Sequence, residues 1–474
     1  MIRSSITKIL FIINYSLLII LSSCSVSKQI GKQANTILLK DTAISTGHIG
    51  ICIYEPATNK YWYGYDDTHY FIPASNTKLF TLYAGMKYLG DSLVGLRYKT
   101  YNIPSDTITE ITATGDPSFL LNEFKYQPVL DFLKSQKKIA INELQYLNPL
   151  GMGWAWDDYQ ETYMAPRSTF PMYGDVVKVK WNNKDSVPIF PKYFHKESEN
   201  LNFLDSGFNL TRKWGSNSLI FTPGTNKNSA TTFESDLLTQ IKLLEDTLPD
   251  LDIFVNYQPL QHFPKHFPKP ITRDSVSLSD QKYMNEFLSY REYKNHYFDL
   301  KNNTIHSQPT DSLFKPMMHR SDNFFAEQTL LMASNEHLGY MNDEKIIDTI
   351  LKTDLKDIPQ RPKWVDGSGL SRYNLFSPED FIFLLNKMRE DFSWNRITTI
   401  LPTGGTGTIS NYYKNLKGRI FVKTGTLSNN VALSGYLITK KNKTLIFSVL
   451  VNNHISSVND IRKDIEAFLT TIAE

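Results

Sequence analysis

The sequence predicts an α+β fold, in which both ends of the chain contribute strands to one antiparallel sheet with helices and a large strand-rich insertion separates them. Near the start, "HIGICIYEP" and "KYWYGYDD" have the composition of two strands around the turn residues "ATN". Near the end, "RIFVKTGTL", "VALSGYLIT" and "TLIFSVLVNN" alternate apolar and polar residues or run β-branched, and "KKNK" predicts a hairpin between the last two. One sheet built from both ends accounts for this arrangement.

Helical periodicity appears beside these strands. From Ser75 to about Leu89, apolar residues recur at the spacing of one helix face. The segments "KQANTILLKDT" and "SVNDIRKDIEAFLTTIAE" predict helices near the two ends. The middle is richer in Pro, Asn and aromatic residues, with one helix predicted near "TFESDLLTQIKLLEDTL". We therefore assign residues 37–100 and 283–474 to the main domain and residues 101–282 to the insertion.

Composition limits the function classes. The 474 residues are 41% hydrophobic and 21% charged, which is typical of a globular protein of more than one domain. Without residues 1–23, which carry two cations and no acid, the formal net charge falls from +3 to +1. Charge therefore gives no support for nucleic acid as a partner.

The N-terminus has the features of an export signal. Two cations precede an apolar run of 13 residues from Ile9 to Leu21, which is short of a membrane span. The run ends in "LSSC", which resembles a bacterial lipobox, so we expect a signal peptide over residues 1–23, lipidation of Cys24 and a tether over residues 24–36. A plain secretory signal is the alternative. Either reading predicts an exported protein of the periplasm or cell envelope, and lipidation would anchor it to a membrane. Cys52, in an apolar strand, is expected to be an inert core thiol.

Three short motifs carry the chemistry. Ser75 stands three residues before Lys78, but the same Ser-x-x-Lys spacing also starts at five other serines, so it decides nothing alone. Two further motifs follow in order: Ser321-Asp322-Asn323, and the single Lys-Thr-Gly of the chain at 423–425. The ordered set resembles the signature of penicillin-binding proteins and serine β-lactamases.

This chemistry needs these residue types. A serine hydroxyl is a weak nucleophile until a base takes its proton, and residues three apart in a helix share a face, so Lys78 can reach Ser75. The resemblance implies that Ser321 relays a proton to the leaving amine, that Asn323 holds the substrate amide, and that Lys423 supplies charge for a terminal carboxylate.

The strand with Thr424, Gly425 and Thr426 is expected to pair with an extended peptide. The backbone amides of Ser75 and Thr426 are expected to form the oxyanion hole.

The spacing narrows the resemblance. The first and second motifs are separated by 242 residues, counted between Lys78 and Ser321. This long separation resembles that of the class C low-molecular-mass penicillin-binding proteins, which are the D-alanyl-D-alanine carboxypeptidase/endopeptidases of the penicillin-binding protein 4 type. "TATGDPSF", "GWAWDDYQETYMAP", "DGSGLSRYNLFSP" and "LPTGGTGT" follow the same family pattern. The resemblance implies a penicillin-binding-protein/serine β-lactamase-like transpeptidase domain, with the insertion between its first and second motifs.

The resemblance also suggests further site residues. By position, Asp158 and Arg372 would hold the diamino acid of the stem peptide, although a turn-capping acid and a surface cation are equally good readings. We expect Trp154 and Trp156 to pack between the insertion and the main domain. No metal or other cofactor is predicted, since there is no His-Glu-x-x-His and Pro264 separates His262 from His266.

The sequence thus predicts a serine D-Ala-D-Ala carboxypeptidase and/or DD-endopeptidase that acts on peptidoglycan stem peptides and binds β-lactam antibiotics. A β-lactamase is disfavoured by the insertion and by the lack of a Glu-x-x-Leu-Asn segment to position a deacylating water. A non-catalytic peptidoglycan-binding envelope protein is the third reading.

Overall fold

The computed structural model describes residues 26–103, 106–142, 147–182, 187–199, 207–256 and 303–474. The expected signal peptide, Cys24 and the expected boundary between residues 282 and 283 lie outside these ranges. Within them, no helix combines the length and apolar character needed to cross a bilayer.

The central sheet has five antiparallel strands in the order β14-β15-β16-β1-β2. Its strands are β1 (His48–Glu55), β2 (Lys60–Tyr65), β14 (Ile420–Leu427), β15 (Asn430–Ile438) and β16 (Thr444–Asn452). In the register that joins the two ends of the chain, His48 lies opposite Asn452 and Tyr54 opposite Ile446. The predicted sheet, built from both ends of the chain, is therefore confirmed, as is the final hairpin.

The two faces of this sheet bury different residues, because side chains alternate along a strand. On β16, Ile446 and Leu450 belong to one core, whereas Leu445 and Val449 belong to the other. The first core contains residues from helices α2 (Lys78–Tyr88), α6 (Thr310–His319), α7 (Asn323–Leu338), α8 (Asp343–Lys352), α9 (Pro378–Asp391) and α10 (Trp394–Ile400). The second contains residues from α11 (Val458–Ala473) and the short π-helical segment η1 (Asn35–Leu39).

Helix α2 lies inside the first core and is buried on all sides from Lys78 to Met86. An apolar helix without a polar face is stable in such a position, enclosed by other elements. The segment expected to be a tether differs from the prediction. Residues 26–34 are helical, and Ile30 and Ala34 pack into the second core.

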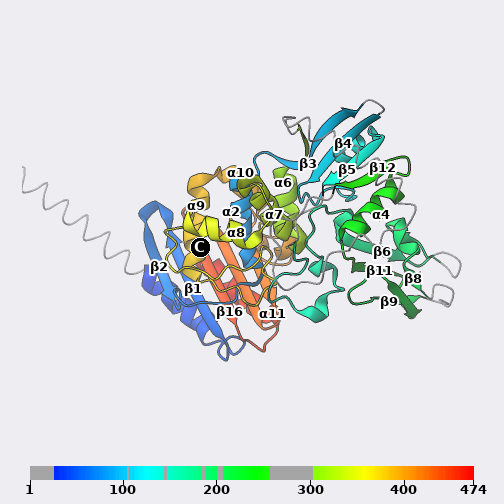
Figure 1. The fold of residues 1–474 in the computed structure, drawn as a ribbon. Helices are drawn as coiled ribbons and strands as arrows, with labels where there is room; N and C mark the ends of the chain where they lie inside the picture. The colour runs from blue at the N-terminus through cyan, green and yellow to red at the C-terminus, as the bar shows by residue number, and fades with distance from the viewer. Residues whose placement is uncertain (1–25, 104–105, 143–146, 183–186, 200–206, 257–302) are drawn as a thin grey trace, which may run out of the picture.

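The inserted part forms a second lobe beside α6 and α7 (Figure 1). A mixed five-stranded sheet in the order β12-β5-β4-β3-β13 contains both the strand by which the chain leaves the main domain and the strand by which it returns. These strands are β3 (Ser92–Ile103), β4 (Asp106–Ala113), β5 (Lys138–Asn142), β12 (Asp252–Asn256) and β13 (Asn303–Pro309). The expected boundary at residue 101 thus falls inside β3.

Two three-stranded sheets and two helices complete this lobe and share a core of their own. The elements are β6 (Val176–Lys180), β7 (Ile189–Phe190) and β11 (Asn228–Thr232) in one sheet; β8 (Ser198–Glu199), β9 (Phe208–Arg212) and β10 (Leu219–Pro223) in the other; and the helices α3 (Pro128–Lys134) and α4 (Leu237–Thr247). Helix α4 confirms the helix predicted near "TFESDLLTQIKLLEDTL", whereas α3 was not predicted.

Candidate active site

Ser75 lies on a tight 3₁₀ turn, Ala74–Thr77, that leads directly into α2. Ala74 has a φ of 47°, which is uncommon for a residue with a side chain. The turn places the Ser75 hydroxyl 3.0 Å from the Nζ atom of Lys78. The predicted contact between these two residues is therefore present.

The Lys78 side chain is completely buried, and its Nζ donates three hydrogen bonds. Besides Ser75, it reaches Oδ1 of Asn323 at 2.6 Å and the backbone carbonyl of Ser368 at 2.6 Å. An ammonium has three donors, so a protonated Lys78 uses all of them. Once neutral, the amine has a lone pair that can accept the proton of the Ser75 hydroxyl.

Burial favours that neutral form. It lowers the pKa of the Lys78 ammonium to about 8, although nearby carboxylates, chiefly Asp366 and Glu327, act in the opposite direction. A lysine in this environment is a base near neutral pH.

The second and third motifs meet beside this pair. Ser321 has a φ of 60° immediately before α7, whose N-cap Asp322 accepts a hydrogen bond from the backbone of Phe325. The Ser321 hydroxyl accepts a hydrogen bond of 2.8 Å from Nζ of Lys423, which also donates to the carbonyl of Thr424 at 2.6 Å. The five residues predicted for catalysis are thus brought together from the turn that leads into α2 and its first residue, from the start of α7, and from β14.

Lys423 itself is completely buried, behind Ser321. Burial lowers the pKa of its ammonium well below the usual value, and the positive charges of Lys78 and Arg462 add to this effect. The Thr424 side chain is also turned away, since its hydroxyl donates to Thr408 at 2.8 Å. Direct contact of Lys423 with a substrate carboxylate stays a prediction, and the structure places its ammonium on Ser321 instead.

Two glycines permit the close packing around Ser75. A side chain on Gly425 would lie 2.5 Å from the carbonyl oxygen of Pro73, so glycine lets β14 approach the nucleophile turn. A side chain on Gly369, where φ is +81°, would lie 2.0 Å from the carbonyl oxygen of Ala74. The loop that carries the Ser368 carbonyl therefore lies directly against the turn.

A cleft of about 420 Å³ opens over these groups and is bounded by both lobes. Ser75, Ser321 and Thr426 line it from the main domain, and Asp158 lines it from the insertion. This is the position that an extended peptide would need in order to present a carbonyl to Ser75.

The predicted pair Asp158 and Arg372 also lies in this cleft. Asp158 hydrogen-bonds the hydroxyl of Tyr163 and thereby helps to raise the pKa of that phenol to about 12, mainly an effect of burial. Arg372 is exposed and donates to the carbonyl of Ser428 at 3.3 Å. The two side chains stand where they could contact a ligand, and their contact with a diamino acid stays a prediction.

The two tryptophans behave differently. Trp154 confirms the packing prediction, because its Nε1 donates to Asp366 at 2.9 Å and the Arg167 guanidinium lies 6.0 Å from its ring. For Trp156 the prediction is wrong. Its side chain is 72% exposed and meets the ring of Trp214 edge to face, within the insertion.

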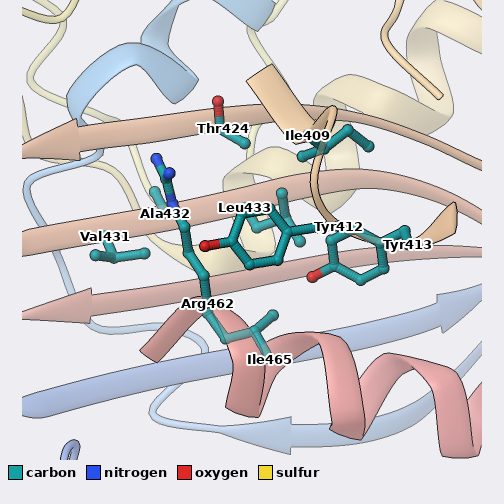
Figure 2. A pocket seen from close by; sticks show the side chains of 9 residues that line it. All are labelled: Ile409, Tyr412, Tyr413, Thr424, Val431, Ala432, Leu433, Arg462 and Ile465. Atoms are coloured by element: carbon teal, nitrogen blue, oxygen red, sulfur yellow. The ribbon is translucent and has the colours of Figure 1, made fainter. Parts of the chain in front are cut away.

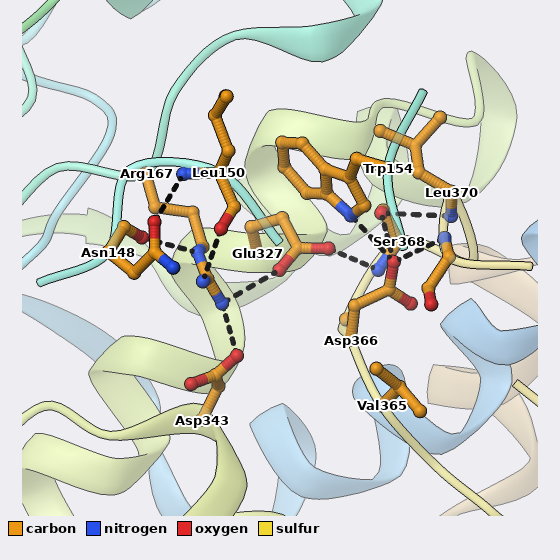
Figure 3. A network of polar contacts seen from close by, with 12 residues as sticks. Asn148, Leu150, Trp154, Arg167, Glu327, Asp343, Val365, Asp366, Ser368 and Leu370 are labelled. Atoms are coloured by element: carbon orange, nitrogen blue, oxygen red, sulfur yellow. Dashed lines mark hydrogen bonds and ion pairs between the residues drawn. The ribbon is translucent and has the colours of Figure 1, made fainter. Parts of the chain in front are cut away.

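A buried polar network supports the site from behind (Figure 3). Glu327 on α7 accepts a hydrogen bond of 2.7 Å from the backbone nitrogen of Ser368, the residue whose carbonyl holds Lys78. Burial raises the pKa of Glu327 to about 7, and the Asp366 charge adds to the rise. Arg167 from the insertion lies 3.9 Å from Glu327 and also pairs with Asp343.

Sequence reasoning missed most of this network. "DGSGLSRYNLFSP" follows the family pattern and Ser321-Asp322-Asn323 forms the second motif, yet nothing in their spacing indicates that Glu327 binds the Ser368 amide. The feature of the sequence that could have indicated a functional Glu327 is its position as an acidic residue within a largely apolar helical segment. The carbonyl of Tyr163 accepts a hydrogen bond of 2.8 Å from Nδ2 of Asn323, and no sequence pattern predicts this contact.

No group of three or more His, Cys, Asp or Glu side chains arranged to hold a metal ion occurs among the residues with described positions. Cys52 is buried and free, and burial raises the pKa of its thiol, in agreement with the prediction of an inert core residue.

Comparison with known families identifies this arrangement. The model of the D-Ala-D-Ala carboxypeptidase 3 (S13) family matches residues 32–188 and 303–472, more than half of the chain. The chain belongs to this family. The matched ranges contain all three motifs described above.

Two curated relatives are similar over shorter segments. Carboxypeptidase DacB of Mycolicibacterium smegmatis is 28% identical over 162 residues, which are 31% of this chain and 35% of the relative. D-alanyl-D-alanine carboxypeptidase DacB of Haemophilus influenzae is 25% identical over 156 residues, 31% of this chain and 33% of the relative. The matched segments thus span about a third of the curated relatives.

Solved structures show the fold. Penicillin binding protein 4 (dacB) from Haemophilus influenzae superposes with a TM-score of 0.67 at 16% identity, covering 94% of this chain and 99% of that one. The same protein complexed with a novel β-lactam gives a TM-score of 0.61 at 16% identity over 94% and 98%. The predicted penicillin-binding-protein fold with its insertion is confirmed.

Proposed function

We propose that this S13 protein is a serine-type D-Ala-D-Ala carboxypeptidase and/or DD-endopeptidase that acts on peptidoglycan stem peptides. The observation that carries the proposal is the 3.0 Å contact between Ser75 and a buried Lys78 whose pKa is lowered to about 8. A buried lysine with a lowered pKa does not need a serine partner for structural reasons. A lysine that acts as the base for a hydroxyl nucleophile must lie beside that hydroxyl.

The geometry suggests an order of proton transfers. Neutral Lys78 takes the hydroxyl proton as Ser75 attacks the carbonyl carbon of a D-Ala residue, and the negative charge on the carbonyl oxygen is held by backbone amides. Collapse of the tetrahedral intermediate breaks the peptide bond. Ser321, hydrogen-bonded to Lys423, gives its hydroxyl proton to the departing amine and receives in its place the proton that Lys78 took from Ser75, which leaves Lys78 neutral again. Water then hydrolyses the ester on Ser75 and restores the free enzyme.

The same serine is proposed to be acylated by β-lactams, which carry a strained amide in place of the peptide bond. Support comes from the fold shared with the Haemophilus influenzae protein that was solved with a β-lactam. Slow deacylation is expected because the chain lacks a Glu-x-x-Leu-Asn segment. A rapid β-lactamase and a non-catalytic envelope protein are the competing functions.

The test uses the protein from residue 25 onward, mixed with a purified pentapeptide monomer and a cross-linked muropeptide dimer, with products read by mass spectrometry. Loss of one D-Ala from the monomer, or conversion of dimer to monomers, supports the proposal and ranks the two activities. Ser75→Ala is the control and should give neither product. Bound fluorescent penicillin without peptide cleavage would favour the binding protein, and rapid penicillin turnover would favour the β-lactamase.

We also propose that the protein is exported and held at a membrane of the cell envelope by acyl chains on Cys24. The cations, the 13-residue apolar run and the following "LSSC" support this. In a bacterial host, Cys24→Ser should move the protein from the membrane fraction to the soluble fraction. If the variant stays in the membrane fraction at the wild-type level, the lipid anchor is wrong.

A further inference from the structure

Arg462 extends from the first turns of α11, past the ring of Tyr412, toward the strand that carries Thr424 (Figure 2). Its Nη2 donates a hydrogen bond of 2.8 Å to the hydroxyl oxygen of Thr426, and its guanidinium lies 6.0 Å from the Tyr412 ring. The hollow that Arg462 shares with Thr424 has a volume of about 10 Å³, so it holds no more than about one water molecule. The guanidinium therefore does not serve a separate ligand site there.

The charge of Arg462 is not neutralised locally. Across the part of the chain with described positions, no carboxylate forms an ion pair with its guanidinium. Glu466, one turn further along α11, accepts a hydrogen bond from the backbone nitrogen of Tyr413 instead. An arginine is permanently protonated, so this is a fixed positive charge beside Thr426.

Thr426 connects that charge to the cleft. Its exposed side chain lines the same cavity as Ser75 and Ser321. The Thr426 oxygen already accepts from Arg462, which leaves its own O–H free to donate into the cleft. An anionic group on the substrate would therefore accept a hydrogen bond from the Thr426 hydroxyl, whose oxygen is itself bound by the Arg462 guanidinium.

Lys423 offers a contrast. Its ammonium is completely buried and is committed to the hydroxyl of Ser321 and the carbonyl of Thr424. Arg462, in contrast, binds the exposed Thr426 hydroxyl, which lines the cleft.

We propose that Arg462 is a specificity-determining residue that, through the Thr426 hydroxyl, selects substrates whose leaving group carries a free α-carboxylate. Such a carboxylate is present on a terminal D-Ala and on the D-centre of a cross-linking diamino acid. The inference rests on the proposed acyl transfer to Ser75 and deepens it, since it names the group that fixes the leaving end of the substrate.

The test compares two acyl-D-Ala thioesters that differ in the leaving thiol: one carries a carboxylate and the other a neutral amide of the same length. Arg462→Ala is expected to lower kcat/KM for the carboxylate substrate about 10- to 100-fold, as for a lost charge-assisted hydrogen bond. The neutral substrate should change less than about twofold. Arg462→Lys should recover part of the lost rate, and Thr426→Val should reproduce the selective loss.

Controls separate this role from a structural one. Lys463→Ala, which removes the neighbouring exposed cation on α11, should leave both substrates unchanged. Equal losses on both substrates in Arg462→Ala would overturn the inference in favour of a packing role, and so would no loss on either. A wild-type protein that cleaves neither thioester and binds no penicillin would overturn the proposed function itself.

Discussion

Replacing Lys78 with methionine removes the amine from the buried site and keeps an unbranched apolar side chain in the same space. The structure gives this amine two roles that a methionine lacks: it stands 3.0 Å from the Ser75 hydroxyl as a base, and it donates hydrogen bonds to Asn323 and to the carbonyl of Ser368. We therefore expect Lys78→Met to lower the rate of Ser75 acylation by about 10²- to 10⁴-fold, the usual contribution of a general base.

The size of the effect near neutral pH follows from the pKa shift. An ordinary lysine with a pKa of 10.5 is about 0.03% neutral at pH 7, whereas a pKa of about 8 makes about 10% of the amine neutral. Burial of Lys78 thus raises the concentration of the reactive form about 300-fold at this pH. Because the neutral form is the active one, the acylation rate should rise with pH and level off above about pH 8.

The assay is the second-order rate of labelling by a fluorescent penicillin from pH 5.5 to 9.5. The wild-type rate should fall about tenfold for each pH unit below about 7. Lys78→Met should lose this slope together with the rate. Lys87→Met is the matched control, because Lys87 lies on the same helix with its side chain 39% exposed and its Nζ 3.6 Å from Asp354.

Two results would refute the reasoning. A wild-type profile that is flat between pH 6 and 9 would mean that no group with a pKa near 8 controls acylation. Labelling of a folded Lys78→Met within tenfold of wild type would mean that another group takes the proton. Folding of each variant is checked by circular dichroism and thermal melting, so that a lost rate is not confused with a lost structure.

Two further predictions concern the groups around this lysine. Gly369→Ala should cost more than about 1 kcal/mol of stability and lower acylation at least tenfold, because its Cβ would lie 2.0 Å from the carbonyl oxygen of Ala74. Gly90→Ala, at a φ of +67° with nothing within 4 Å, should show the backbone cost alone in thermal melting, and equal behaviour of the two variants would contradict the contact. Glu327→Gln keeps an acceptor for the Ser368 amide and removes a negative charge that raises the pKa of Lys78, so the rising limb of the labelling profile should move to lower pH; an unchanged or upward-shifted limb would contradict this.

Once the ordered set of three motifs singles out Ser75, local order in the sequence is enough to predict the first half of the site. Ser75 and Lys78 are three residues apart at the start of a helix, so their contact follows from helix geometry. Lys423 in a β-strand and Asn323 at the start of a helix follow from similar short-range patterns. The central sheet could be predicted for the same reason, because its strands are apolar runs with clear turns.

The contacts between distant segments could not be predicted in this way. The Ser368 carbonyl reaches Lys78 from a loop that has no regular periodicity, and Arg462 reaches Thr426 from the opposite side of the sheet. Trp156 shows the converse error. Its neighbour Trp154 packs as expected, but the packing of one tryptophan in a loop carries no information about the exposure of another two residues away.

The insertion contributes directly to the environment of the base. Within one stretch of it, the carbonyl of Tyr163 holds Asn323, the indole of Trp154 holds Asp366, and the guanidinium of Arg167 lies beside Glu327.

Each of those three partners then acts on Lys78: Asn323 as an acceptor, and Asp366 and Glu327 as charges that raise its pKa. Asp366 also accepts hydrogen bonds from the backbone nitrogens of Gly369 and Ser371, so it shapes the loop whose carbonyl binds the lysine. The second lobe therefore does more than line one side of the cleft. It fixes the acceptor and the charges that act on Lys78 against the effect of burial, and an isolated main domain would keep every residue of the three motifs while losing this influence on the base.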